Sequence, residues 1–150
     1  AFDVVLGSTA PSLPGLRRVA AHDPRLTLHV DARDMADLTL NADIAIGGGG
    51  STTWERCTLG LPSLLITLAD NQRPAARALA DRDAVLMVDA EADGFETAFD
   101  RAAVRLMTDA ACRARLTAAS LEVCDGLGAD RVATAFLEVV AAPRDAAVRV

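Results

Sequence analysis

The sequence predicts an α/β fold, a Rossmann-like doubly wound parallel sheet, and three observations lead to it. Short apolar segments alternate with helix-like segments along residues 3–88. This alternation is typical of parallel strands joined by right-handed crossover helices. Four consecutive glycines follow one strand, at the edge where such sheets bind ligands. With 51% hydrophobic and 24% charged residues, the 150-residue chain has the composition of an ordered globular domain.

The individual elements follow from apolar spacing and from turn residues. Five apolar runs predict strands over residues 3–8, 26–30, 42–46, 63–68 and 84–88. Helices are predicted near residues 16–20 and over residues 34–40, 52–59 and 73–80. After residue 88 the chain becomes Ala-rich and charged, which predicts helices over residues 91–107, 111–121 and 129–142. We therefore expect one doubly wound unit over residues 1–142 and a tail over residues 143–150, starting at Pro143.

Composition and charge exclude several classes of function. The 15 Lys and Arg against 21 Asp and Glu give a net charge of −6, and aromatic residues make up only 3% of the chain. A basic surface and a set of stacking platforms for nucleic acid are therefore not expected. The three cysteines form no CxxC pair, which favours a reducing, cytoplasmic setting. No metal-site spacing is present, and the apolar runs are far shorter than the roughly 20 residues of a membrane span.

The segment at residues 46–55, Ile-Gly-Gly-Gly-Gly-Ser-Thr-Thr-Trp-Glu, carries the most functional information. Glycines allow close backbone approach to a phosphate, and a following helix start adds N–H donors, so an anionic ligand is predicted. The dinucleotide fingerprint matches only degenerately and the P-loop lysine is missing, which argues against hydride transfer and ATP hydrolysis. The alternative is a tight turn in which Thr52 caps the helix and Glu55 completes a capping box. The residues alone leave both interpretations open.

A second polar segment follows the predicted strand at residues 63–68. It reads Leu-Ala-Asp-Asn-Gln-Arg over residues 68–73 and lies on the same edge of a parallel sheet as the glycines. Its short polar side chains suit the hydroxyl groups of a sugar. One of them alternatively caps the helix that follows. Two polar loops on one edge predict a binding site.

Three motifs in this region point to a family. They are Gly47-Gly-Gly-Gly-Ser-Thr-Thr-Trp-Glu-Arg-Cys57, Leu59-Gly-Leu-Pro-Ser-Leu64 and Leu68-Ala-Asp-Asn-Gln72. Together they closely resemble the C-terminal domain of the PseG family of UDP-sugar hydrolases of pseudaminic acid biosynthesis, over about residues 3–135. More distantly, the chain is similar to the MurG peptidoglycan N-acetylglucosaminyltransferases. The resemblance implies the C-terminal, nucleotide-binding half of a two-domain GT-B-type fold.

The resemblance also assigns roles to four groups of residues. The positions that match the diphosphate-contacting loop are Gly49, Gly50, Ser51, Thr52 and Thr53. Glu55 matches the acid that binds the ribose hydroxyls, which favours the ligand interpretation of this residue over capping. The uracil wall is matched by Val30 and Met35, and the sugar-facing positions by Asp70, Asn71 and Gln72.

The family's reaction is hydrolysis of the bond between an anomeric carbon and UDP, with water attacking and inverting the configuration. The substrate is a UDP-linked diacetamido-trideoxy sugar, the product is UDP, and no cofactor or metal is implied. The resemblance places the catalytic base, a histidine, in an N-terminal domain, and places a first strand and glycine loop before residue 3. We therefore expect no catalytic residue in this chain, no turnover by it alone, and self-association through an exposed sheet edge. The alternatives are a MurG-like glycosyltransferase and a non-catalytic nucleotide-binding domain.

Overall fold

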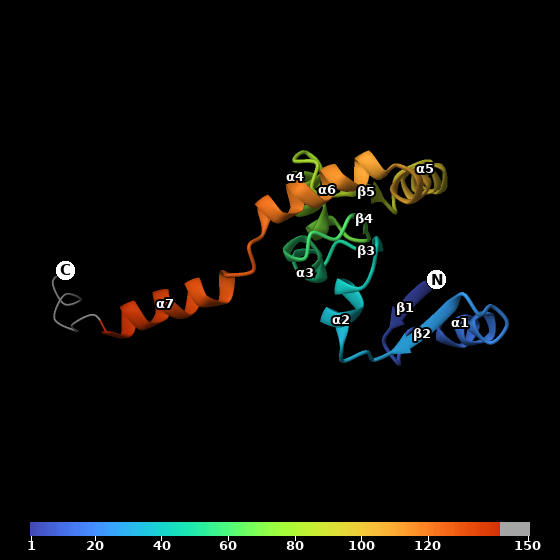
Figure 1. Ribbon diagram of the computed structural model, residues 1–150, viewed down its shortest axis with the longest axis horizontal. Helices are drawn as coiled ribbons and strands as arrows, with labels where there is room; N and C mark the ends of the chain where they lie inside the picture. The colour runs from blue at the N-terminus through green and yellow to red at the C-terminus, as the bar shows by residue number, and fades with distance from the viewer. Residues whose placement is uncertain (142–150) are drawn as a thin grey trace. The chain divides into compact units, whose positions relative to one another are not determined.

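The computed structural model describes residues 1–141, which divide into two compact units. The first unit, Ala1–Asp43, contains β1 (Phe2–Leu6), α1 (Leu13–Ala20), β2 (Leu26–Val30) and α2 (Met35–Leu40) (Figure 1). β1 and β2 pair in parallel, from Phe2 opposite Leu26 to Leu6 opposite Val30. Leu13, at the start of α1, is the buried hydrophobic side chain of this unit.

The second unit begins at Ile44 and is built on a parallel sheet with the strand order β3-β4-β5. Its strands and α-helices, which Figure 1 labels, are β3 (Ala45–Gly48), α3 (Thr52–Thr58), β4 (Ser63–Thr67), α4 (Arg73–Ala80), β5 (Leu86–Asp89), α5 (Phe95–Thr108), α6 (Ala110–Val123) and α7 (Gly128–Ala141). A short 3₁₀ helix, η1 (Asp70–Gln72), precedes α4. Each strand is followed by a helix, so α3 and α4 form the crossovers between parallel neighbours.

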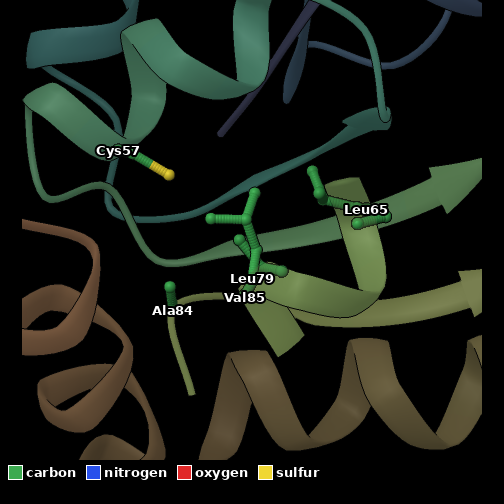
Figure 2. Packing of buried hydrophobic residues seen from close by; sticks show 6 residues of the cluster. Cys57, Leu65, Leu79, Ala84 and Val85 are labelled. Atoms are coloured by element: carbon green, nitrogen blue, oxygen red, sulfur yellow. The ribbon is translucent and has the colours of Figure 1, made fainter. Parts of the chain in front are cut away.

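The central strand β4 is buried on both faces of this sheet. Leu64 and Leu65 are both 0% exposed, and as neighbours on a strand they point to opposite faces. Leu65 belongs to one core cluster with Cys57 of α3 and Leu79 of α4 (Figure 2). Leu64 belongs to another cluster, with Leu106 of α5 among its members. Helices therefore cover both faces, which confirms the predicted doubly wound α/β class.

Several element boundaries differ from the sequence prediction. β3 was expected over residues 42–46 but runs over Ala45–Gly48, so two of the glycines are strand residues. Backbone pairing to β4 holds them in place, because Gly47 lies opposite Leu65 and Gly48 opposite Ile66. The helix expected from residue 91 begins at Phe95, because Gly94 has a φ of +75°, a left-handed conformation that precedes the helix.

The strands also form two sheets where one was expected, and within residues 1–141 no backbone ladder joins them. The assignment of residues 1–142 to one nucleotide-binding domain stays a prediction. The predicted tail, residues 143–150, and the predicted helix end at residue 142 lie outside the described residues.

Candidate functional site

The candidate site lies at the carboxyl edge of the three-stranded sheet, where β3 ends in glycine. The N–H of Gly49 donates to the carbonyl of Ile66 at 3.1 Å, which continues the β3–β4 pairing by one bond. The chain then leaves the sheet and enters α3 at Thr52. We call residues 49–52 the glycine loop. Its position confirms that the glycine run connects a parallel strand to a helix.

The glycine loop leaves three consecutive backbone donors unused. Within residues 1–141, the N–H groups of Gly50, Ser51 and Thr52 donate no hydrogen bond. The pattern ends with the next two residues, since the N–H groups of Thr53 and Trp54 donate to the carbonyls of Gly50 and Ser51, both at 3.1 Å. Successive free N–H groups in a turn form an anion-binding concavity. The loop can therefore accept a phosphate without breaking any bond of its own.

The hydroxyl groups of the predicted diphosphate loop fall into two kinds. Ser51 and Thr52 are exposed, and their hydroxyls make no hydrogen bond among the described residues. Thr53 is only 3% exposed, and its hydroxyl accepts a hydrogen bond from Arg56 at 3.2 Å. Ser51 and Thr52 can thus reach a ligand directly, whereas the Thr53 hydroxyl is engaged inside the protein.

The capping-box alternative for Glu55 is wrong for this structure. The residue at the N-cap position of α3 is Ser51, not Thr52, and it makes no side-chain capping bond. Glu55 is exposed and forms no ion pair or hydrogen bond with any described residue. Its carboxylate is therefore available to a ligand.

The second polar segment lies against the glycine loop. Within this segment, Oε1 of Gln72 accepts a hydrogen bond from the N–H of Leu68 at 3.0 Å. A Cβ placed on Gly49 would lie 3.5 Å from both Cβ and Oε1 of Gln72. We call residues 68–72 the DNQ loop. The structure thus brings the predicted phosphate and sugar residues of the second unit to one edge, while Asp70 and Asn71 are exposed.

Arg73 fixes the DNQ loop and was not identified from the sequence. Its Nε and Nη2 donate to the two carboxylate oxygens of Asp89 at 2.6 and 3.1 Å. Nη2 also donates to Glu91 at 2.6 Å, and Nη1 pairs with Asp70. Chiefly through these hydrogen bonds, Arg73 lowers the pKa of Asp89 to about 2. The spacing of three between Asp70 and Arg73 could have suggested one of these pairs.

Arg56 is the second residue that sequence reasoning missed. Its Nη2 donates to the carbonyl of Gly48 at 3.0 Å as well as to the Thr53 hydroxyl. Its Nε is buried and has no hydrogen-bond partner among the described residues. Burial is the main influence on the pKa of Arg56 and lowers it, although Cys57 and Glu55 act in the opposite direction. Arg56 lies three residues after Thr53, which places the two on one helix face.

The predicted uracil residues belong to the first unit. Val30 ends β2 and Met35 begins α2, and both are partly buried. Between them, Asp31 has a φ of +51°, and its carboxylate accepts a hydrogen bond from the N–H of Ser8 at 2.8 Å. This bond lowers the pKa of Asp31 and joins the ends of β1 and β2. The role of Val30 and Met35 in uracil binding stays a prediction.

Two further properties concern the described chain as a whole. Residues 1–141 contain no group of three or more His, Cys, Asp or Glu side chains placed to hold a metal ion. No helix in this range is long and apolar enough to cross a membrane.

Comparison with known proteins relates the chain to glycosyltransferase-like proteins. No family model matches it. The chain is 33% identical over 82 residues to the spore coat polysaccharide biosynthesis protein SpsG of Bacillus subtilis strain 168, a match that covers 55% of this chain and 24% of SpsG. It is also 33% identical over 120 residues to the UDP-N-acetylglucosamine–N-acetylmuramyl-(pentapeptide) pyrophosphoryl-undecaprenol N-acetylglucosamine transferase of Sorangium cellulosum strain So ce56. That match covers 77% of this chain and 30% of the transferase. The chain therefore spans less than a third of the length of either relative.

Solved structures show the fold. Spinosyn forosaminyltransferase SpnP matches with a TM-score of 0.65 and 20% identity, covering 93% of this chain and 34% of that structure. The glycotransferase of kitacinnamycin matches with a TM-score of 0.56 and 17% identity, covering 83% of this chain and 39% of that structure. These neighbours have the GT-B glycosyltransferase fold, so the predicted GT-B-like architecture is confirmed. The specific resemblance to the PseG hydrolases is not tested by them.

Proposed function

We propose that this chain is the nucleotide-binding part of an enzyme that cleaves the anomeric C–O bond of a UDP-linked sugar and releases UDP. The observation that carries the proposal is the row of three unused N–H donors at Gly50, Ser51 and Thr52. An anion with several oxygens satisfies such a row, and a diphosphate is the anion that UDP-sugars present. A relative that uses a UDP-sugar by name supports this choice.

Each part of the site has one role in the proposed binding mode. The glycine loop, from Gly49 to Thr52, holds the diphosphate, and the free carboxylate of Glu55 accepts hydrogen bonds from the ribose hydroxyls. The DNQ loop, with Asp70, Asn71 and Gln72, faces the sugar. For the first unit taken by itself, we propose that Val30 and Met35 contact uracil, as the sequence resemblance implies.

The proposed chemistry is stabilisation of a leaving group. When water attacks the anomeric carbon and inverts its configuration, the bond to the diphosphate oxygen breaks and negative charge grows on UDP. Fixed N–H donors and hydroxyls aimed at that charge lower the barrier, because they need no reorganisation during the reaction. The base that deprotonates the water comes from outside this chain, and we propose that it is a histidine of the full-length enzyme. The sugar we favour is a diacetamido-trideoxy sugar of surface polysaccharide biosynthesis, made in the cytoplasm.

A glycosyltransferase is the second candidate, and the Sorangium relative favours it because its name gives it an N-acetylglucosamine transferase activity. The same site would hold the same donor, but the sugar would pass to an acceptor hydroxyl instead of water. Product analysis with the full-length protein separates the two: free sugar beside UDP supports the hydrolase, and an acceptor-linked product supports the transferase. Binding without either product supports a non-catalytic domain.

The nucleotide site itself is tested by calorimetric titration of the full-length protein with UDP, UMP and ADP. We expect UDP to bind most tightly, and Thr52→Ala and Glu55→Ala each to weaken it by about tenfold or more, the usual effect of losing a hydrogen bond to a charged group. Thr97→Ala and Glu122→Ala make the same chemical changes at exposed helix positions and should bind UDP like wild type. Equal affinities for all three nucleotides, or no effect of the two site variants, would reject the proposed site.

A further inference from the structure

Arg56 is a charged side chain without a charged partner. Among residues 1–141 it forms no ion pair with a carboxylate, in a protein whose net charge is −6. The side chain is partly buried, and its Nε is wholly buried and unbonded. Removing a cation from water is costly unless opposite charge compensates it. An arginine guanidinium keeps its proton in proteins, so Arg56 carries a positive charge at neutral pH.

The bonds of Arg56 lie at the base of the glycine loop. By donating to the Gly48 carbonyl and to the Thr53 hydroxyl, Nη2 connects the last residue of β3 to the first turn of α3. The three unused N–H groups lie between these two attachment points in the sequence. Fixing both ends of so short a segment restricts the directions of the N–H groups in the middle.

Gly47 makes room for this arrangement. A Cβ placed on Gly47 would lie 2.8 Å from Nη1 of Arg56, closer than a non-bonded carbon and nitrogen can approach. Gly47 is a paired strand residue without a positive φ, so its backbone does not itself require glycine. A side chain at this position therefore requires the Arg56 guanidinium to move from its observed place.

We propose that Arg56 is the positioning residue of the glycine loop and that its unpaired charge makes the loop selective for a diphosphate over an uncharged nucleoside. This inference rests on the proposed function and adds to it the residue that sets the loop's preference for charge. The guanidinium acts in two ways: its hydrogen bonds orient the N–H donors, and its positive charge, little screened by water, attracts the anion bound above the loop. Bound diphosphate in turn supplies the opposite charge that Arg56 lacks.

The test compares UDP with uridine, which shares the base and ribose but carries no phosphate. Affinities for both are measured by calorimetry on the full-length wild-type protein and on Arg56→Gln, Arg56→Lys and Gly47→Ala. We expect Arg56→Gln to weaken UDP binding by about tenfold to a hundredfold, which is the range for one charge-assisted interaction. Uridine binding should weaken by less than about twofold. Arg56→Lys keeps the charge and should recover part of the loss. Gly47→Ala keeps the arginine but displaces its guanidinium, and should also weaken UDP binding more than uridine binding.

Arg77→Gln is the matched control, because it removes the same charge from an exposed position of α4 and should bind both molecules like wild type. If UDP and uridine weaken by the same factor in Arg56→Gln, the residue is only structural and the inference is wrong. If Arg56→Gln does not fold, the ratio of UDP affinity to uridine affinity is measured in Arg56→Lys and Gly47→Ala, and a lower ratio than in wild type supports the inference. If wild type binds no UDP, the proposed function fails first. If wild type binds UDP but no variant changes the ratio, only this inference fails.

Discussion

The two loops at the edge of the three-stranded sheet use their polar groups in opposite ways. Within residues 1–141, the glycine loop keeps three backbone donors and two hydroxyls free, whereas the DNQ loop bonds internally through Gln72 and Leu68 and pairs with Arg73 through Asp70. Free donors at a surface suit a ligand that provides many acceptor oxygens. A loop that is already bonded suits the wall of a site, because its shape does not depend on the ligand. We propose from this difference that the glycine loop provides the binding energy and the DNQ loop provides shape.

The largest effect is expected from removing one free donor of the glycine loop. Ser51→Pro deletes the N–H of residue 51, whose φ of −59° already matches proline, and the preceding Gly50 has no Cβ to clash with the ring. Because that N–H donates no hydrogen bond to any described residue, the thermal stability should stay equal or rise slightly. The affinity for UDP, measured by calorimetry, should fall by about tenfold to a hundredfold.

Ser51→Ala is the control for the lost hydroxyl, since Ser51→Pro removes both the hydroxyl and the N–H. We expect Ser51→Ala to reduce the affinity for UDP less than Ser51→Pro does. Equal losses in the two variants would mean that the backbone donor is not used, and would remove the contrast between the two loops.

The prediction of the fold from the sequence was correct where local patterns determine structure. The run Ser-Leu-Leu-Ile-Thr at β4 is buried on both faces, and such a run has few alternatives in an α/β chain. The prediction failed where long-range pairing decides. Gly47 and Gly48 belong to β3 because they pair with β4, and glycine composition alone indicates a loop. The same holds for the division into two sheets, which depends on strand order and not on any local segment.

The site was predictable to a similar extent. The glycine run and the DNQ motif lie after neighbouring parallel strands, and this topology alone brings them to one edge. Arg56 and Arg73 were missed because their importance depends on partners that only the folded chain supplies. Arg73 reaches Asp89, the last residue of β5, and Arg56 reaches a strand carbonyl eight residues earlier. Unused N–H groups are likewise invisible in a sequence.

The next largest effect is expected from removing the Arg73 guanidinium, which joins Asp70 of the DNQ loop to Asp89 and Glu91. Arg73→Met keeps the length of the side chain but leaves Asp70, Asp89 and Glu91 without their shared cation. Thermal unfolding should show a lower Tm than for Arg77→Met, the same substitution at an exposed position of the same helix. UDP affinity should fall less than in Ser51→Pro, because no ligand donor is lost. A loss of UDP binding as large as that of Ser51→Pro, with Tm unchanged, would show that Arg73 contacts the ligand.

A smaller effect is expected from pH, through Asp89. The pKa of this carboxyl is about 2 in the folded protein and about 3.9 in an unfolded chain, so the Arg73 pair stabilises the fold fully above about pH 4. The stabilisation should disappear as the pH falls towards about 2. Asp89→Asn removes the titrating group, so the Tm difference between wild type and this variant should shrink from about pH 5 to about pH 2. A difference that stays constant over this range would contradict the assigned pairing.

The smallest effect is expected from Asp70→Ala, and it separates the two uses of the DNQ loop. The Asp70 side chain is 91% exposed. Arg73 keeps its ion pairs with Asp89 and Glu91 when Asp70 is replaced, so Tm should stay within error of wild type. Asp93→Ala, at another exposed position, is the control. If the DNQ loop faces the sugar, Asp70→Ala should weaken a UDP-sugar but not UDP. Equal weakening of both would mean that Asp70 supports binding of the UDP part and not of the sugar, and that outcome would contradict the proposed role of the DNQ loop.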